Sequence, residues 1–248
     1  MFLVVYAAVL LLSLLSGLTT LVGVALALHF RENVRGIAVG IGFSAGIMLL
    51  ISFFELIPES ANAIGMINTS ISILSGVLMI GVLNFIIPHT HLPKEKGKAD
   101  DQALKAAYLI AFGLILHDFP EGFAMANSYI YSPSLGLLIA LAIAIHNIPE
   151  EFAMAVPIVS VKEKSFLLKA AFLSGLAEPA GAIIGLFAVD LMPALAPIFM
   201  SFAAGAMILV SVHELLPMAT KYRETTMFIL GLILSVLVYL ALDLLIPE

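Results

Sequence analysis

The sequence predicts an all-α polytopic membrane protein with eight transmembrane helices, and three observations support this class. The chain of 248 residues is 62% hydrophobic and 11% charged, with a mean hydropathy of +1.13, whereas soluble domains are about half apolar and about a quarter charged. Its apolar residues form long runs that are separated by short polar or proline-containing turns. Its basic residues are confined to every second turn. A bilayer is therefore the expected environment of the whole chain.

Composition also excludes several classes of function. The chain has no cysteine, so disulfides and thiolate metal sites are excluded. The net charge of -6 comes largely from acidic residues inside apolar runs, so it describes buried groups more than a charged surface. We expect no nucleic-acid partner.

The apolar runs are long enough to cross a membrane as helices, which need about 20 residues each. Helices are expected because lipid cannot satisfy free backbone groups, and barrel strands would be shorter and alternating. The first run is too long for a signal peptide and lacks a basic start, so we interpret it as a retained span. The expected spans cover residues 2–28, 34–57, 70–88, 103–129, 135–160, 166–190, 194–219 and 225–246. Residues 1–248 should form a single integral membrane domain.

The basic residues indicate the orientation of these spans. All of them follow the first, third, fifth or seventh span. They are Arg31, Arg35, Lys94, Lys96, Lys98, Lys105, Lys162, Lys164, Lys169, Lys221 and Arg223. Cytoplasmic connections carry an excess of Lys and Arg. The pattern predicts a multi-pass protein of the inner (plasma) membrane with both termini outside.

A duplicated motif in the middle of the chain carries the chemistry. HDFPEGFAMA at 117–126 recurs as HNIPEEFAMA at 146–155. Each copy places a His four residues before a Glu, and residues four apart share one face of a helix. Both copies lie inside apolar runs, where ionisable side chains are costly and usually functional. Two such faces brought together would form a metal site inside the membrane.

A further acidic residue, Glu178, lies at a comparable depth in the sixth span. Each cluster begins about 12–15 residues into its span, near the midplane. Carboxylates gathered there would repel one another, and a divalent cation would balance them. Imidazole with carboxylate suits zinc, iron, manganese, cobalt, nickel or cadmium. The candidate metal ligands are His117, Asp118, Glu121, His146, Asn147, Glu150 and Glu178.

These candidates form two overlapping sets, so the centre could be binuclear with Glu121 and Glu150 as bridges. One set is His117, Glu121, His146 and Glu150; the other is Asp118, Asn147, Glu178 and the same two glutamates. A lone membrane His or Asn often only forms a hydrogen bond between helices. Because the spacing is duplicated on adjacent spans, we favour metal ligands.

The sequence leaves the roles of several other polar residues open. Glu151 lies about 100° around the helix from Glu150, so its direction is open. His213 and Glu214, near the cytoplasmic end of the seventh span, are candidate ligands on an exit pathway. His89 and His91 lie in the longest loop, which is either a solvated linker or a transient metal-capture segment.

A second repeat relates the two ends of the chain. Residues 42–58, GFSAGIMLLISFFELIP, match residues 203–217, AAGAMILVSVHELLP. By the predicted topology the two segments cross the membrane in opposite directions, which is typical of inverted-repeat transporters with midplane sites. The spans then group as 3+2+3. Close helix packing alone would explain the small residues but not the matching Glu and Pro.

In these motifs the sequence resembles the ZIP family of divalent-metal transporters, in particular its ZupT-like bacterial branch. The motifs that carry the resemblance are HDFPEG at 117–122, HNIPEE at 146–151, SGLAEPAGA at 174–182 and the two segments of the second repeat. The resemblance implies a 3+2+3 fold of eight helices, metal import, and a bundle of spans 1, 4, 5 and 6 that moves against the other spans.

By motif, the resemblance also implies roles for individual residues. Glu121, His146 and Glu150 would hold a zinc-type site with His117 beside it. A second, iron-type site would use Asp118, Glu121, Asn147, Glu150 and Glu178. The chain departs from the family pattern at Asp118, where Asn is common, and at Glu151, where Gly is common. Both departures add negative charge near the centre.

The expected function is therefore secondary transport that imports divalent metals, Zn²⁺ foremost and Fe²⁺, Mn²⁺ or Cd²⁺ besides. The metal is the substrate, no cofactor is expected, and a homodimer is compatible with the sequence. We find no glycine-rich phosphate-binding loop with Lys, so we expect transport without ATP unless a separate subunit supplies it. The alternative is an intramembrane metallohydrolase that uses metal-bound water. Its weakness is that the spacing is HxxxE rather than HExxH, with only Glu151 as a spare general base.

Overall fold

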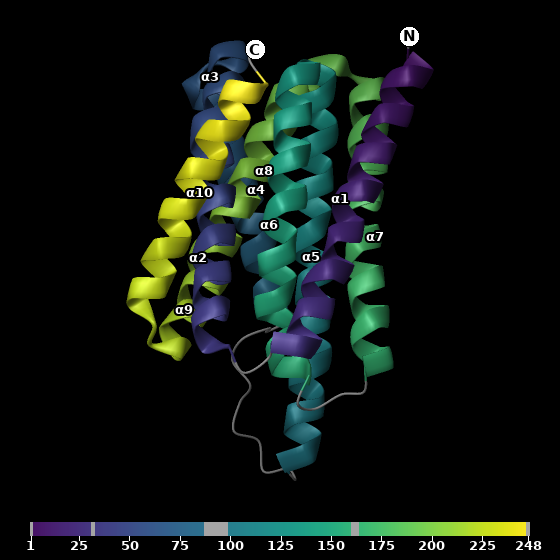
Figure 1. The fold of residues 1–248 in the computed structure, drawn as a ribbon. Helices are drawn as coiled ribbons and strands as arrows, with labels where there is room; N and C mark the ends of the chain where they lie inside the picture. Colours follow the sequence, from purple (N-terminus) through teal and green to yellow (C-terminus); the bar gives the residue numbers. More distant parts are fainter. Residues whose placement is uncertain (1, 31–32, 87–98, 160–163, 247–248) are drawn as a thin grey trace.

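The computed structural model describes residues 2–30, 33–86, 99–159 and 164–246, and within them the chain is helical except for short turns (Figure 1). Three short segments, labelled η, have π or 3₁₀ geometry. In order, the elements are α1 (Phe2–Phe30), α2 (Val34–Leu50), η1 (Ile51–Leu56), α3 (Ile57–Ile64), α4 (Met66–Ile86), α5 (Ala99–Tyr131), α6 (Pro133–Val159), α7 (Lys164–Leu191), η2 (Pro193–Leu195), α8 (Ala196–Val210), η3 (Ser211–Leu215), α9 (Leu216–Tyr222) and α10 (Thr225–Leu245).

The helices have the length and composition of membrane spans. In the described part of the chain, seven helical stretches are long and apolar enough to cross a bilayer. They are Leu3–Phe30, Val34–Ile64, Met66–Phe85, Pro133–Val156, Lys164–Leu191, Pro193–Tyr222 and Thr225–Leu245. The span expected at 103–129 lies within α5, whose side chains at 99–112 fall outside the described part. The all-α polytopic membrane class is therefore confirmed.

The expected helix bounds are close to the observed ones, with one clear error. The second span was expected to end at residue 57, but the helix continues past Pro58 to Ile64. A π-helical turn, η1, precedes the proline, and the N–H of Ile57 bonds to the carbonyl of Ser52, five residues back. Pro58 lies inside the continuous helical stretch Val34–Ile64, and a local π turn is one way in which a membrane helix satisfies the backbone groups that an interior proline leaves free. Gly65 ends the helix at a φ of 80°, a backbone conformation that favours glycine.

The matching segment of the second repeat has the same unusual local structure. Here the π-helical turn is η3, and the N–H of Leu216 bonds to the carbonyl of Ser211, again five residues back. The hydroxyls of Ser52 and Ser211 each donate to the carbonyl four residues back, at 2.7 and 2.9 Å. Such π-bulges occur frequently at functional sites. The sequence repeat thus corresponds to a repeated structural feature.

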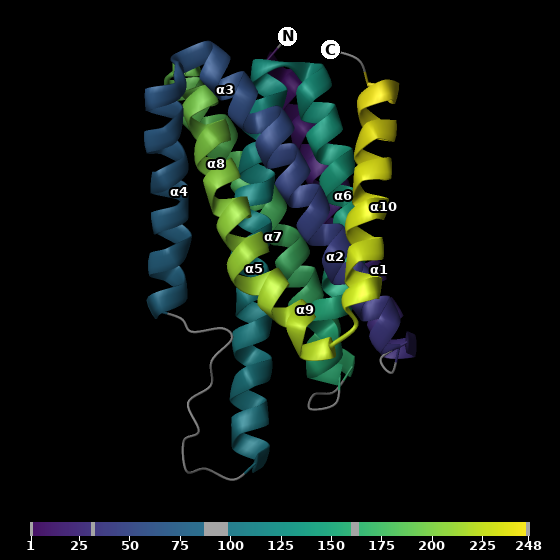
Figure 2. The same cartoon turned by 90° about the vertical axis from the view of Figure 1, so that its left-hand side faces the viewer.

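The helices pack in two sets (Figures 1 and 2). In one set, α1 packs on α6 and α7, and α5 packs on α6 and α7. The second set contains the pairs α2–α10 and α4–α8, which contact the first set through α2–α6 and α5–α8. Glycine allows the closest approach: a Cβ on Gly122 of α5 would lie 1.9 Å from the carbonyl oxygen of Glu178 on α7. This contact holds α7 directly against the acidic face of α5.

The two ends of the bundle differ. The start of α1 and the end of α10 lie at one end, together with α3 (Figure 1). At the other end α5 extends beyond the remaining helices (Figure 2). Arg35, Lys164 and Lys221 lie near helix termini at this second end. The charge asymmetry predicted from the sequence is therefore visible in the described helices.

A buried hydrogen bond between Glu55 of η1 and Tyr239 of α10 allows a test of how these two elements pack. The Glu55 carboxylate is 5% exposed and accepts a hydrogen bond from the Tyr239 hydroxyl of α10. We expect Tyr239→Phe to lower the free energy of unfolding by about 1–3 kcal/mol, because a buried carboxylate loses a donor. Thermal unfolding in detergent measures the change. Tyr129→Phe is the matched control, since Tyr129 donates no hydrogen bond within the described residues, and equal shifts in both variants would contradict the prediction.

Candidate metal centre

The structure brings the seven predicted ligands to three neighbouring helices. α5 presents three of them, α6 presents three and α7 presents Glu178. All are buried, with exposed fractions of 2% for His117, 4% for Asp118, 1% for Glu121, 0% for His146, 3% for Asn147, 3% for Glu150 and 0% for Glu178. Helices α5 and α7 continue through the interior prolines Pro120 and Pro179. The set is therefore enclosed by protein.

Three of these residues converge. His146 Nε2 lies 3.3 Å from Glu121 Oε1 and 3.6 Å from Glu150 Oε2. One ligand atom from each residue lies within 4.8 Å of the others. Tetrahedral zinc with bonds of about 2.0–2.2 Å separates its ligand atoms by about 3.3–3.6 Å. Glu121, His146 and Glu150 therefore have the spacing of a metal site.

The orientation of the His146 ring suits metal binding. Its Nδ1 lies 2.9 Å from the carbonyl oxygen of Ala142, one turn earlier on α6. A carbonyl only accepts, so Nδ1 carries the hydrogen and donates it. In the neutral ring, Nε2 then has a free lone pair that faces the two carboxylates.

His117 lies beside this triad rather than within it. Its Nδ1 is 3.8 Å from Glu150 Oε1, and its Nε2 is 2.9 Å from Glu214 Oε2. The sequence predicted His117 in one set with the triad, but the structure turns its other nitrogen toward η3. His117 therefore links Glu150 to Glu214.

The remaining candidates are held by contacts to α7. The Asn147 amide donates to Glu178 Oε1 at 2.6 Å, and the Ser174 hydroxyl donates to Asp118 Oδ2 at 2.6 Å. Ser174 was not among the predicted site residues. It lies four residues before Glu178, on the same helix face, and that spacing is the signal that could have identified it.

Several carboxylate oxygens lack hydrogen-bond donors. Within the described residues, no hydrogen bond reaches Oε2 of Glu121, Oε2 of Glu178, or either oxygen of Glu150 and Glu151. A buried acceptor without a donor destabilises the fold. Carboxylates retained in this state inside a membrane protein are typical of an ion-binding site.

Glu151, whose direction the sequence left open, also faces inward. It is 1% exposed, and its charged neighbours are Asp118, Glu150 and His117. Its Cβ lies against α1, because a Cβ on Gly23 would be only 2.6 Å from it. Glu150 and Glu151 are both buried because α6 has protein on both of these faces.

The two predicted exit residues, His213 and Glu214, differ in burial. Glu214 is 2% exposed, and its Oε1 accepts from the Asn84 amide of α4 at 2.9 Å. His213 is exposed and lines a pocket of about 280 Å³ with Asn84. Sequence reasoning missed Asn84, because nothing in its apolar surroundings links it to η3. His89 and His91 lie outside the described residues.

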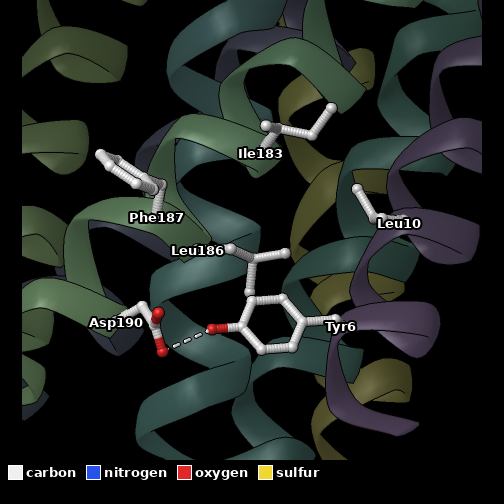
Figure 3. Close-up of a pocket in the computed structure, with 6 residues that line it drawn as sticks. All are labelled: Tyr6, Leu10, Ile183, Leu186, Phe187 and Asp190. Carbon is white, nitrogen blue, oxygen red and sulfur yellow. Dashed lines mark hydrogen bonds between the residues drawn. The ribbon is translucent and has the colours of Figure 1, made fainter. Parts of the chain in front are cut away.

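A second pocket lies between α1 and α7, at the end of the bundle where α1 begins (Figure 3). Its volume is about 270 Å³. The Tyr6 hydroxyl donates to Asp190 Oδ1 at 2.9 Å. Apolar side chains form the rest of the lining: Leu10, Ile183, Leu186 and Phe187. None of the predicted ligands lines this pocket, so the open cavity and the buried His/Glu cluster are separate features.

Membrane-spanning helices around a buried His/Glu cluster are the architecture of a membrane transporter for cations. The family model described as ZIP Zinc transporter matches residues 88–242. The zinc transporter ZupT of Chlorobium luteolum is 40% identical over 97% of this chain and 98% of its own length. Those of Corynebacterium aurimucosum and Streptococcus mutans are 39% and 36% identical, over 90% and 92% of this chain and 91% and 93% of their own lengths.

This chain belongs to the ZIP zinc transporter family. The resemblance predicted from its motifs is confirmed. Because the family consists of transporters, membership favours transport over the metallohydrolase alternative.

Proposed function

We propose that this chain is a secondary transporter that imports divalent transition metal ions into the cytoplasm, with Zn²⁺ as the first substrate and Fe²⁺, Mn²⁺ or Cd²⁺ as others. The observation that carries the proposal is the convergence of Glu121, His146 and Glu150 in a buried position. One imidazole with two carboxylates suits zinc and related metals. The names of the relatives, each a zinc transporter, support the order of substrates.

The proposed centre has two adjacent positions. Glu121, His146 and Glu150 hold the first ion, with His117 beside it, and Asp118, Asn147 and Glu178 complete the second position with the two shared glutamates. The Asn147–Glu178 hydrogen bond supports the second position, because it orients a carboxylate whose other oxygen has no donor in the described part. The metal passes through as substrate, and the protein requires no cofactor.

The same proposal includes the 3+2+3 topology, in which α5 is the fourth span and brings the total to eight in one membrane domain over residues 1–248. Helix contacts support an inverted repeat, because the pair α2–α10 corresponds to α8–α4 and the pair α1–α6 corresponds to α7–α5. The two π-helical turns support it further. The start of α1 and the end of α10 lie at the same end of the bundle (Figure 1). This arrangement fits a chain that crosses the membrane an even number of times, with both termini outside. Homodimerisation remains a prediction of the sequence.

On its way into the cytoplasm, the metal ion passes from the cluster along His117 to Glu214. The 2.9 Å approach of His117 Nε2 to Glu214 Oε2 and the hydrogen bond from Asn84 place polar atoms between the cluster and the pocket that His213 lines. An ion leaving Glu150 would meet these groups in turn. In the proposed cycle, α1, α5, α6 and α7 move together against the other helices.

Uptake into proteoliposomes tests the function. A zinc-sensitive dye and a pH dye inside the vesicles follow metal entry and any proton movement, since metal binding to His and carboxylates releases protons. We expect Zn²⁺ to enter without ATP and not to enter protein-free vesicles. Release of a labelled lipid or peptide product without net metal entry would instead support the metallohydrolase.

Glu214→Ala should separate release from binding. We expect the initial rate of Zn²⁺ uptake to fall by about 10–100-fold, the usual cost of losing a group next to a metal site. Zn²⁺ binding by the purified protein should fall much less than uptake does, because the triad is intact. Glu59→Ala, on half-buried α3, is the control. If binding falls as far as uptake, Glu214 is a ligand of the centre itself.

A further inference from the structure

The pocket between α1 and α7 has one polar end and an apolar side (Figure 3). Tyr6 and Asp190 form the polar end, joined by the 2.9 Å hydrogen bond from the Tyr6 hydroxyl to Asp190 Oδ1. Apolar side chains line the rest of its volume of about 270 Å³. None of the seven predicted metal ligands lines it, so the pocket has no part in the proposed transport site.

The pocket extends from the depth of the lipid headgroups into the hydrocarbon. Asp190 is the last residue but one of α7 (Lys164–Leu191), which has 28 residues. A helix of this length measures about 42 Å, whereas the hydrocarbon core is about 30 Å thick, so Asp190 lies among headgroups. Ile183 comes seven residues earlier and lies about 10 Å deeper. On α1 the order is the same, since Tyr6, a residue type enriched at membrane interfaces, precedes Leu10.

The apolar side of the pocket opens toward the lipid. Ile183 and Phe187 are 54% and 65% exposed on the bundle, whereas Leu186 is 3% exposed and lies at the base of the pocket. Leu10 of α1 lines the opposite wall. An acyl chain that lies in this pocket would therefore contact two helices at once.

The polar end carries a negative charge with no Lys or Arg beside it. All eleven Lys and Arg residues follow the first, third, fifth or seventh expected span, and Lys164 and Lys221 lie near the opposite end of the bundle. Within the described helices, the hydrogen-bond partner of Asp190 is Tyr6, which donates to Oδ1. The exposed Oδ2 can therefore accept from a cationic ligand.

A primary ammonium headgroup matches this end of the pocket. It carries a positive charge and three N–H donors, and N–H donors form strong, charge-assisted hydrogen bonds with a carboxylate. A trimethylammonium headgroup has the charge but no N–H, and an anionic headgroup would be repelled by Asp190. Phosphatidylethanolamine joins a primary ammonium to acyl chains, with the same separation in depth as that between Asp190 and Ile183.

We propose that the pocket between α1 and α7 binds one phospholipid with a primary ammonium headgroup, of the phosphatidylethanolamine type. The ammonium donates to Asp190 Oδ2, the Tyr6 hydroxyl orients the carboxylate, and one acyl chain lies along the apolar side. In the topology proposed above, this lipid belongs to the outer leaflet. Because it contacts both α1 and α7, the lipid reinforces the packing of these helices at this end of the bundle.

Native mass spectrometry of the full chain tests the proposal, with phosphatidylethanolamine and phosphatidylcholine of the same acyl chains titrated into detergent. We expect phosphatidylethanolamine to bind about three- to tenfold more tightly, between the effect of an exposed ion pair and that of a hydrogen bond to a charged group. In Asp190→Asn the difference should fall below about twofold, because the amide oxygen still accepts from Tyr6 but the charge is lost. Glycerophosphoethanolamine, which lacks acyl chains, should not displace the bound lipid.

Asp243→Asn is the matched control. Asp243 is an exposed acid near the end of α10, at the same end of the bundle (Figure 1), so this variant should keep the lipid preference. Unchanged Zn²⁺ binding shows that each variant is folded.

Three results would overturn the proposal: equal binding of the two lipids by the wild type, a preference that Asp190→Asn retains or Asp243→Asn loses, or displacement of the lipid by glycerophosphoethanolamine. Lipid binding is measured without zinc, so its failure is distinguishable from a failure of transport.

Discussion

Replacing Glu150 with alanine should abolish Zn²⁺ uptake, with a loss of at least about 100-fold in the initial rate. Its Oε2 lies 3.6 Å from His146 Nε2 and its Oε1 lies 3.8 Å from His117 Nδ1, so one side chain faces both histidines. Loss of a group that only supports a metal ligand costs about 10–100-fold, and loss of the ligand itself should cost more. Uptake into proteoliposomes at several Zn²⁺ concentrations measures the effect.

Companion variants define the prediction for the triad. Glu121→Ala should be as severe as Glu150→Ala, because both residues contribute to the convergent atoms. Glu150→Asp should keep partial activity, since the carboxylate remains but the shorter side chain holds it farther from His146. Glu59→Ala, an acid outside the cluster, should transport normally. Undiminished uptake in both Glu121→Ala and Glu150→Ala would contradict the assignment of the site.

Gly122→Ala should prevent most of the protein from folding. An added Cβ would lie 1.9 Å from the carbonyl oxygen and 2.7 Å from the Cα of Glu178. These are backbone atoms, so relief requires α5 and α7 to separate. Overpacking a core lowers the free energy of unfolding by about 1–3 kcal/mol and sometimes more. A clash with backbone atoms should give a loss at the upper end of this range or above it. The fraction that elutes as a monodisperse peak, and the unfolding temperature of that fraction, measure the result.

Gly81→Ala is the matched control for this substitution. Gly81 also lies inside a helix, but the nearest atom to an added Cβ is Leu209 Cδ2 at 3.7 Å, an ordinary contact. Alanine is about 1 kcal/mol more favourable than glycine in a helix interior, so stability should be unchanged or slightly higher. If Gly81→Ala and Gly122→Ala behaved alike, the α5–α7 contact would not have the importance assigned to it.

Much of the site could be predicted because membrane helices leave few alternatives. Apolar length defines where each span lies, and a spacing of four residues defines a shared face. These two facts bring His146 and Glu150 to one face and place Glu121 at a similar depth. In the structure, one ligand atom from each of the three lies within 4.8 Å of the others; their role as metal ligands stays a prediction.

The parts that could not be predicted depend on how each helix is rotated about its axis. The direction of Glu151 followed from the contact between α6 and Gly23 of α1, which no periodicity reveals. The approach of His117 to Glu214 joins two spans that are distant in sequence. The π-helical turn before Pro58 was missed because proline ordinarily indicates a helix end.

Zinc K-edge X-ray absorption on the purified, zinc-loaded chain tests the central claim most directly. Glu121, His146 and Glu150 as ligands predict only nitrogen and oxygen neighbours at about 2.0–2.2 Å, with the outer-shell scattering of an imidazole ring. In His146→Ala this imidazole contribution should fall while the protein remains folded. A spectrum of hydrated zinc without imidazole, or one that His146→Ala leaves unchanged, would contradict the account.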